Sequence, residues 1–357
     1  MTKAINDWKT KPYGRVMDDK EMRKRSHWAH PYCVFDPGAP VDMDHVEEML
    51  KGGIDVHIHG APIAGKLYGR PKMTDTCIAA SEVGMKALVF KDHNTMTNNA
   101  AVVLQEMLDL RAKEKAELGE VFTPVQVFGG ITLNYQVGGM NKLAVEAALN
   151  TGRCKEIWLP SMNAAHQHEA VALPGEPDDP GIRVSDCAGT LTPEMIEILE
   201  IMAEYNDNAA GKRVCLSVCH VSNEEKFDIQ DYVNRKGLDV KILWDHVTQE
   251  MTILLPDEAK QAIDMGAYLE FAEVTCVPWP GMRDNIVAFD YSFNLIKELI
   301  AEKGPEHLVL ISDAGQPGNE PITGWRWFLK WLLGKGVSES DINVMFKETP
   351  AMLLGKI

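Results

Sequence analysis

Two histidines separated by one residue follow an apolar run near the start of the chain. Residues 51–62 read KGGIDVHIHGAP, which places His57 and His59 at the end of a strand-like segment. Alternate residues of a β-strand point to the same face, so both imidazoles can bind one cation. Gly60 lets the chain turn sharply away from a crowded site. This spacing indicates a metal centre, provided that other segments supply further ligands.

Further residues that can bind a metal end other apolar runs. His220 follows VCLSVC, His246 ends ILWDH and Asp313 ends LVLISD. A single histidine at a strand end is more often a hydrogen-bonded residue than a ligand, but this combination favours metal binding. Three or four imidazoles with one carboxylate suit Zn²⁺, or another divalent first-row metal such as Mn²⁺, Fe²⁺ or Co²⁺. We therefore predict one or two metal ions per chain, bound by His57, His59, His220, His246 and Asp313.

The segments that carry these residues alternate between strand-like and helical patterns. Strands are expected at residues 54–59, 86–91, 124–131, 156–160, 214–220, 240–247, 267–273 and 307–313. Helices are expected near 74–83, 96–117, 139–150, 192–210, 223–236, 256–265, 284–302 and 322–336. Eight such pairs predict an α/β protein with a (β/α)8 TIM barrel, in which the carboxyl ends of the strands meet at one face. An open doubly wound sheet is the alternative, although no GxGxxG follows the first strand.

Composition narrows the possible partners and surroundings. The chain has 357 residues and a formal net charge of −16, which argues against nucleic-acid binding. Seven scattered cysteines without a CxxC pair argue against a disulfide framework and a cysteine-rich zinc site. The first residues lack an apolar signal segment, and no apolar run has membrane-spanning length, so we expect a cytoplasmic protein without membrane contact. Residues 1–50 are interpreted as an N-terminal extension with a short helix, and residues 51–357 as the barrel domain.

The order of the candidate ligands resembles the motif of the amidohydrolase superfamily, a family of metal-dependent barrel hydrolases. That motif has HxH after the first strand, a histidine after the fifth, another after the sixth and an aspartate after the eighth. FKETPAMLLG, at residues 346–355, is also similar to the closing helix of the family. The resemblance covers residues 54–357, and VFGGITLNYQVGGMN, CHVSNEE and SDAGQP are similar to a bacterial branch of largely unknown function.

The resemblance implies a metal-dependent amidohydrolase that cleaves a C–N bond of an amide, lactam or cyclic imide in a small molecule. Asp313 would act as general base and then as general acid, and His246, His220 or His93 would polarise the carbonyl group. A mononuclear decarboxylase of a small organic acid and a phosphoesterase are the alternatives. A barrel that only binds a metabolite is a further alternative from a different class.

One segment departs from the family pattern. Binuclear members carry a carboxylated lysine or a glutamate at the end of the fourth strand, where this chain has Pro160 and Ser161. Lys91, after the second strand, could serve as a carboxylated metal ligand. It could equally be an unmodified cation that binds substrate or pairs with an acid. The number of metal ions therefore stays open at this point.

Substrate contacts are expected from the loops that follow the strands. His93, His166, Glu270 and Trp279 are the candidates, although His166 lies in a long polar loop and Glu270 could belong to a salt-bridged rim. Glu273 follows the same strand as Glu270 and has the same two interpretations.

Other clusters give weaker indications. Lys66 and Arg183 could bind a substrate carboxylate, but most loop cations are only solvated. WRWFLKW, at residues 325–331, has helical spacing and favours core packing or self-association into a homo-oligomer.

Overall fold

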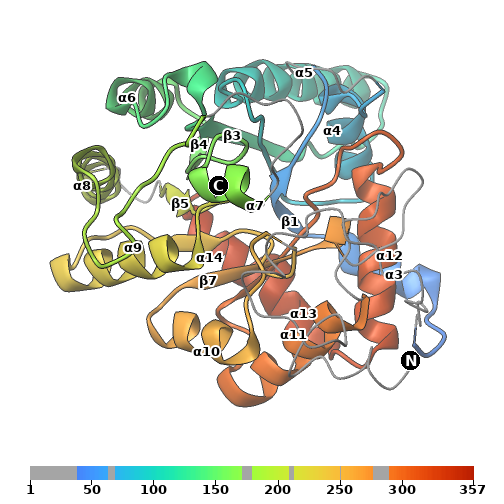
Figure 1. The fold of residues 1–357 in the computed structure, drawn as a ribbon. Helices are drawn as coiled ribbons and strands as arrows, with labels where there is room; N and C mark the ends of the chain where they lie inside the picture. Colours follow the sequence, from blue (N-terminus) through green and yellow to red (C-terminus); the bar gives the residue numbers. More distant parts are fainter. Residues whose placement is uncertain (1–37, 63–68, 171–178, 209–212, 250, 276–288) are drawn as a thin grey trace.

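Eight parallel strands form one sheet in chain order, with helices between them (Figure 1). The computed structural model describes residues 38–62, 69–170, 179–208, 213–249, 251–275 and 289–357. The predicted (β/α)8 TIM barrel is confirmed. The strands are β1 (Ile54–Ile58), β2 (Ala87–Phe90), β3 (Gln126–Thr132), β4 (Cys154–Trp158), β5 (Cys215–Ser217), β6 (Ile242–Trp244), β7 (Tyr268–Ala272) and β8 (Leu308–Ile311).

The helices that follow the strands surround the sheet (Figure 1). They agree with the predicted segments to within a few residues at the described ends, and local caps explain several boundaries. Ser222 and Glu225 form a capping box at the start of α9, and Gly237 ends it in the left-handed region. The helices are α4 (Met73–Glu82), α5 (Asn98–Glu117), α6 (Lys142–Thr151), α8 (Pro193–Asn208), α9 (Asn223–Lys236), α10 (Pro256–Asp264), α11 (Phe289–Lys303) and α12 (Pro321–Gly334).

Shorter elements complete the described chain. α7 (Ala165–Ala170) follows β4, and the 3-10 helices η1 (Tyr135–Val137) and η2 (Glu273–Thr275) follow β3 and β7. α13 (Glu339–Asn343), the π-helix η3 (Val344–Glu348) and α14 (Thr349–Leu354) close the chain. α3 (Met43–Leu50) precedes β1 and packs beside α12, to which it is joined by an ion pair between Glu47 and Arg326. No helix in these residues is long and apolar enough to cross a membrane.

A bulge in β1 decides which side chains enter the barrel. Ile54 and Asp55 pair with the first two residues of β2, and pairing resumes only at Ile58, so that two β1 residues lie opposite one β2 residue. Asp55 points toward α12, where its Oδ2 accepts a hydrogen bond of 2.8 Å from Nε1 of Trp325. His57 instead contacts side chains of β6 and β7 across the barrel. The bulge therefore turns His57 into the interior.

Backbone hydrogen bonds join the first strand to the segment after the last one. The N–H of Asp313 donates to the carbonyl of His57 at 2.8 Å, and the N–H of His59 donates to the carbonyl of Ala314 at 2.8 Å. The N–H of Ser312 also donates to Oδ1 of Asp55 at 3.1 Å. These contacts complete the ring of strands beside the two histidines of the HxH motif.

The aromatic segment in α12 belongs largely to the core. Trp325, Phe328 and Trp331 are buried, whereas Trp327 is 40% exposed and lies beside Lys330. Core packing of this segment is thus confirmed for three of its aromatic side chains. Self-association into a homo-oligomer stays a prediction.

Candidate metal centre

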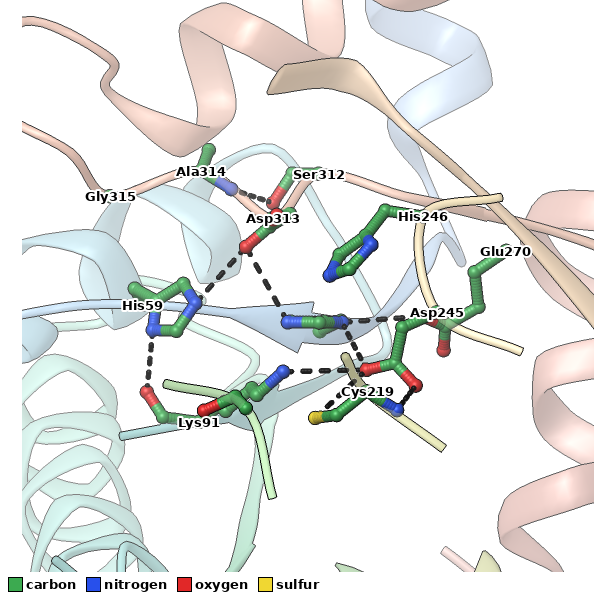
Figure 2. Close-up of polar contacts among 12 residues, drawn as sticks. His59, Lys91, Cys219, Asp245, His246, Glu270, Ser312, Asp313, Ala314 and Gly315 are labelled. Carbon is green, nitrogen blue, oxygen red and sulfur yellow. Dashed lines mark hydrogen bonds and ion pairs between the residues drawn. The ribbon is translucent and has the colours of Figure 1, made fainter. Parts of the chain in front are cut away.

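His57, His59 and Asp313 meet at the end of the barrel where β1 and β8 finish, and Figure 2 shows His59 and Asp313 facing one another. Nε2 of His59 lies 3.0 Å from Oδ1 of Asp313, and Nε2 of His57 lies 3.4 Å from the same oxygen. All three residues are buried, and their ligand atoms lie within 4.8 Å of one another. One divalent cation could therefore be held by two imidazole nitrogens and one carboxylate oxygen.

Each strand-end imidazole is oriented by a hydrogen bond at Nδ1. Carbonyl oxygens and ionised carboxylates only accept hydrogen bonds, so with Glu270 ionised these contacts favour a ring proton on Nδ1 and leave the Nε2 lone pair for a metal. Thr252 acts in the same way, because its hydroxyl donates to the carbonyl of His246. The four contacts are His57 to Oε2 of Glu270 at 3.2 Å, His59 to the carbonyl of Lys91 at 2.9 Å, His220 to Oε1 of Gln167 at 2.7 Å and His246 to Oγ1 of Thr252 at 3.0 Å.

Burial keeps these imidazoles neutral. It lowers the pKa of His57, His59 and His220 well below the usual value, and the positive charge of Lys91 lowers it further. Burial also lowers the pKa of His246 to about 4, although Asp313 and Asp245 oppose this shift. Neutral imidazole is the form that binds a metal, so the set is ready to coordinate at neutral pH.

His220 and His246 lie beside this group of three. Their ring centroids are 5.0 Å apart, and the rings of His246 and His57 are 5.9 Å apart. His246 and Asp313 have φ angles of +31° and +47°, and Cys219 has +47°. Such left-handed backbone is strained in residues other than glycine and is concentrated at functional sites. The assignment of His220 and His246 as metal ligands stays a prediction.

Asp245 and Glu270 both lie close to Nδ1 of His57, and no sequence pattern pointed to Asp245. Oδ1 of Asp245 accepts from the N–H of Cys219 at 2.8 Å, and Oδ2 lies 3.3 Å from Nζ of Lys91 and 3.6 Å from Nδ1 of His57 (Figure 2). Asp245 and Glu270 thus form a second group with His57 that could hold a cation. Because donors already surround Asp245, we interpret it as a residue that orients the site. If the alternation of β6 continued past Trp244, Asp245 and His246 would point to opposite faces, so the sequence pattern predicts only one of them in the site.

Buried acidic groups gather in this part of the barrel. Asp245, Glu270, Asp313 and Glu156 are all buried, and the ammonium group of Lys91 lies among them. Burial and the charge of Asp245 raise the pKa of Glu270 and of Glu156 well above the usual value. Among the described residues, Nε2 of His57 and Oε1 of Glu270 lack hydrogen-bond partners. A divalent cation would stabilise the ionised form of these acids and supply a partner for the imidazole, so these residues fit a metal.

Comparisons with known proteins agree with this barrel. Residues 52–270 match the model of a family of unknown function, DUF6282. The chain belongs to this family. No curated protein matches the sequence.

Three solved structures illustrate the fold of this DUF6282 member. One comes from work on the molecular engineering of organophosphate hydrolysis activity from a weak promiscuous lactonase template, with 16% identity, a TM-score of 0.55 and coverage of 86% of this chain and 97% of that chain. An organophosphorus hydrolase from Deinococcus radiodurans has 15% identity, a TM-score of 0.53 and coverage of 89% and 96%. A β-aspartyl dipeptidase from Fervidobacterium islandicum-AW-1 has 11% identity, a TM-score of 0.54 and coverage of 85% and 72%. These likenesses show the barrel fold that the resemblance to the amidohydrolase superfamily implies.

In this DUF6282 member, the described side chains at the ends of β2 and β4 do not form a ligand that bridges two metals. Nζ of Lys91 pairs with Asp245 and lies 5.7 Å from the ring centroid of Trp158, which in turn lies 6.2 Å from the ring of His57. Burial would lower the pKa of Lys91, but Cys219, Asp245 and Asp313 raise it above the usual value. An ammonium group has no lone pair for a metal. Coordination by Lys91 would therefore require its carboxylation, which stays a prediction.

The predicted substrate contacts lie at different depths. His93 stacks on His59, with their ring centroids 5.0 Å apart. His166 is on α7, with Nε2 at 2.7 Å from the carbonyl of Met251. Glu270 is fully buried below His57, so it lies deeper than a substrate loop. Trp279 is outside the described residues, as is Lys66.

Two further side chains that the sequence suggested as substrate contacts pair with other residues of this chain. Arg183 forms an ion pair of 2.5 Å with Glu169. Glu273 is buried rather than on the rim, and its Oε2 accepts a hydrogen bond of 3.0 Å from Asn319.

Proposed function

We propose that the protein is a cytoplasmic metal-dependent hydrolase that cleaves a C–N bond of an amide, lactam or cyclic imide in a small molecule. The observation that carries this proposal is the approach of Nε2 of His57 and of His59 to one oxygen of Asp313. We assign a zinc ion to these three residues, with His220 and His246 as additional ligands. A bound divalent cation lowers the pKa of a water molecule toward neutrality, which provides a nucleophile at physiological pH.

Asp313 is proposed to move the proton. Burial raises the pKa of its carboxyl group, while His246 and Lys91 oppose the increase, so Asp313 is a stronger base than an exposed aspartate. It would accept a proton from the attacking water and then donate it to the leaving nitrogen. Its left-handed backbone, held by the hydrogen bond from its N–H to His57, directs the carboxylate toward both histidines of the HxH motif.

His93 is the imidazole best suited to polarise the substrate carbonyl. Oγ of Ser161 accepts a hydrogen bond from Nδ2 of Asn134 at 2.8 Å and lies 2.8 Å from Nδ1 of His93. The hydroxyl proton of Ser161 can therefore go to Nδ1, which leaves the ring proton on Nε2 as a donor. His220 and His246 have the opposite tautomer, with Nε2 as a lone pair, and are better suited to hold the metal.

Substitution of Asp313 tests the proposal. We expect D313N to lower kcat by about 100- to 10,000-fold on any lactam, amide or cyclic imide that the wild type hydrolyses, because the base and acid are both lost. D231N, on the exposed face of α9, is the matched control and should keep full activity. Turnover by D313N within about tenfold of the wild type would refute the role of this carboxylate.

Elemental analysis tests the metal centre itself. We expect about one bound zinc ion per chain after purification and reloading, and a much lower content in a variant in which both histidines of the HxH motif are replaced by alanine. Absence of bound metal from the reloaded wild type would refute the centre.

A mononuclear decarboxylase is the second candidate. It is favoured by Trp158 at the end of β4 and by the pairing of Lys91 with Asp245, both of which support a single-metal site. Release of CO₂ without ring opening, measured on small carboxylic acids, would favour this candidate. Hydrolysis of a phosphotriester in place of any C–N bond would favour a phosphoesterase instead.

A further inference from the structure

Arg70 is a buried guanidinium group beside the segments that follow β1 and β8, and the sequence patterns did not single it out. It is 9% exposed, and its Nη1 donates to the carbonyl of Gly315 at 3.3 Å. Within the described residues its Nε has no hydrogen-bond partner, and no carboxylate lies within ion-pair distance of it. A guanidinium has five donors and retains its charge, so a buried one needs more than a single carbonyl.

The backbone holds Arg70 close to the metal centre. The N–H of Ala61 donates to the carbonyl of Pro71 at 2.7 Å, and the N–H of Met73 donates to the carbonyl of Ala61 at 2.8 Å. Arg70 is therefore fixed beside the exit of β1, just beyond His59. Its position does not depend on the long side chain alone.

Gly315, whose carbonyl accepts the hydrogen bond from Arg70, is also close to the metal centre. Gly315 follows Asp313 and Ala314 on the segment that leaves β8 (Figure 2). A Cβ atom on Gly315 would lie 2.1 Å from the carbonyl oxygen of His59, so this segment packs directly on the HxH strand. The guanidinium thus bridges the two segments that supply His59 and Asp313.

The positive charge of Arg70 affects the pKa values of groups in the proposed site. It contributes to the lowered pKa of His59 and of His93, and Asp313 and Asp92 in turn oppose the decrease that burial causes in the pKa of Arg70. These carboxylates lie close enough to act on the charge but not to satisfy its donors.

We propose that Arg70 binds a carboxylate group of the substrate and so determines specificity for small carboxylate-bearing amides, lactams or cyclic imides. A guanidinium pairs with a carboxylate through two parallel hydrogen bonds, and this pairing is strengthened where water is excluded. A carboxylate is favoured over a phosphate because the neighbouring acids repel the more highly charged anion more strongly. This inference rests on the proposed function, since it places the carboxylate beside the same metal centre.

A purely structural role is the alternative. Arg70 could act only as a clamp between the segments after β1 and β8. Loss of a clamp would lower the melting temperature and the affinity for zinc. It would also weaken the binding of carboxylated and neutral ligands alike. Loss of a substrate contact would weaken the binding of carboxylated molecules and leave neutral ones unchanged.

Calorimetric titration of the zinc-loaded protein separates these roles. The probes are two pairs in which one member carries a carboxylate group: 2-pyrrolidinone and 5-oxopyrrolidine-2-carboxylate, and hydantoin and hydantoin-5-acetate. We expect the wild type to bind the carboxylated member of at least one pair tenfold or more tightly. R70Q should weaken that binding by about 10- to 100-fold and change binding of the neutral member by less than about twofold. R70K should be intermediate, because it keeps the charge and loses the paired geometry.

Arg153 provides the matched control. Its Nη1 also donates to a carbonyl, that of Val127 at 2.9 Å, but it precedes β4 at the opposite end of the barrel. R153Q should leave the carboxylate preference intact. The inference is overturned if no carboxylated probe binds more tightly than its neutral counterpart, or if R70Q keeps the preference.

Hydrolysis, followed in the same samples as ring opening, reports on the proposed function separately. Preference lost in R70Q without hydrolysis of any probe would support the binding role and count against the hydrolase. Hydrolysis of neutral probes without any carboxylate preference would support the hydrolase and overturn the role of Arg70.

Discussion

Glu273 offers a prediction whose size follows from its surroundings. The side chain is fully buried directly after β7, and among the described residues its hydrogen-bond donor is Nδ2 of Asn319. Burial raises the pKa of Glu273 from 4.5 to about 8, with smaller contributions from the negative charges of Asp313 and Asp55. Glu273 is therefore protonated in the folded protein at neutral pH.

The sign of the pH effect follows from proton binding in the two states. Between pH 4.5 and about pH 8 the folded protein holds a proton on Glu273 that the unfolded chain has released, so stability falls as pH rises through this range. Each pH unit costs about 1.4 kcal/mol, which gives a maximum of about 5 kcal/mol above pH 8. Glutamine keeps the size of the side chain and the acceptor for Asn319, but it does not titrate. E273Q should therefore become more stable than the wild type as pH rises.

Urea unfolding at a series of pH values measures this difference. Followed by tryptophan fluorescence between pH 5.5 and pH 8, the free energy of unfolding of E273Q relative to the wild type should increase by about 3 kcal/mol. E117Q, on the exposed end of α5, makes the same replacement at a solvated position and should show no such increase. A difference between E273Q and the wild type that stays constant with pH would refute the assignment of a buried, protonated carboxyl group.

Two further predictions concern the walls of the metal centre. G315A places a methyl group 2.1 Å from the carbonyl oxygen of His59 at a φ of +111°, so it should lower the unfolding free energy by about 3 kcal/mol and weaken zinc binding. G119A, at a φ of +76° with no atom within 4 Å, isolates the backbone strain, and equal melting temperatures for the two variants would contradict the proposed clash. D245N leaves the ammonium group of Lys91 without its partner and should cost about 3–5 kcal/mol in urea unfolding, part of which K91M should restore in the double variant. Additive losses in the double variant would argue that the pair is not coupled.

The repeating pattern of the sequence was sufficient to predict the barrel. Apolar runs such as ALVF in β2 and LVLI in β8 are buried on both faces, and capped helical segments separate them. Because a barrel brings the carboxyl ends of its strands together, the order of polar residues after those runs also indicated where a site would lie. The structure brings His57, His59 and Asp313 together at that place.

The interior beneath the histidines could not be predicted in the same way. Asp245 adjoins His246 in the sequence, so alternation assigns the two residues to opposite faces, yet both contact the site. The left-handed backbone at His246 breaks the alternation there, as the bulge breaks it in β1. Neither irregularity has a glycine to mark it. Arg70 was missed for a different reason: a single arginine in a loop has no pattern, and its burial arises only from the folded contacts.

The hydrogen bonds between β1 and the segment after β8 have a consequence for assembly. Asp55 and Ser312 are 257 residues apart in the chain, so this contact has high contact order and forms only when nearly the whole polypeptide is available. Metal capture by a nascent or truncated chain should therefore be weak, since the aspartate is still missing. Once β1 and the segment after β8 have paired, a bound ion would stabilise that contact. Its release would destabilise the first and last strands before any others.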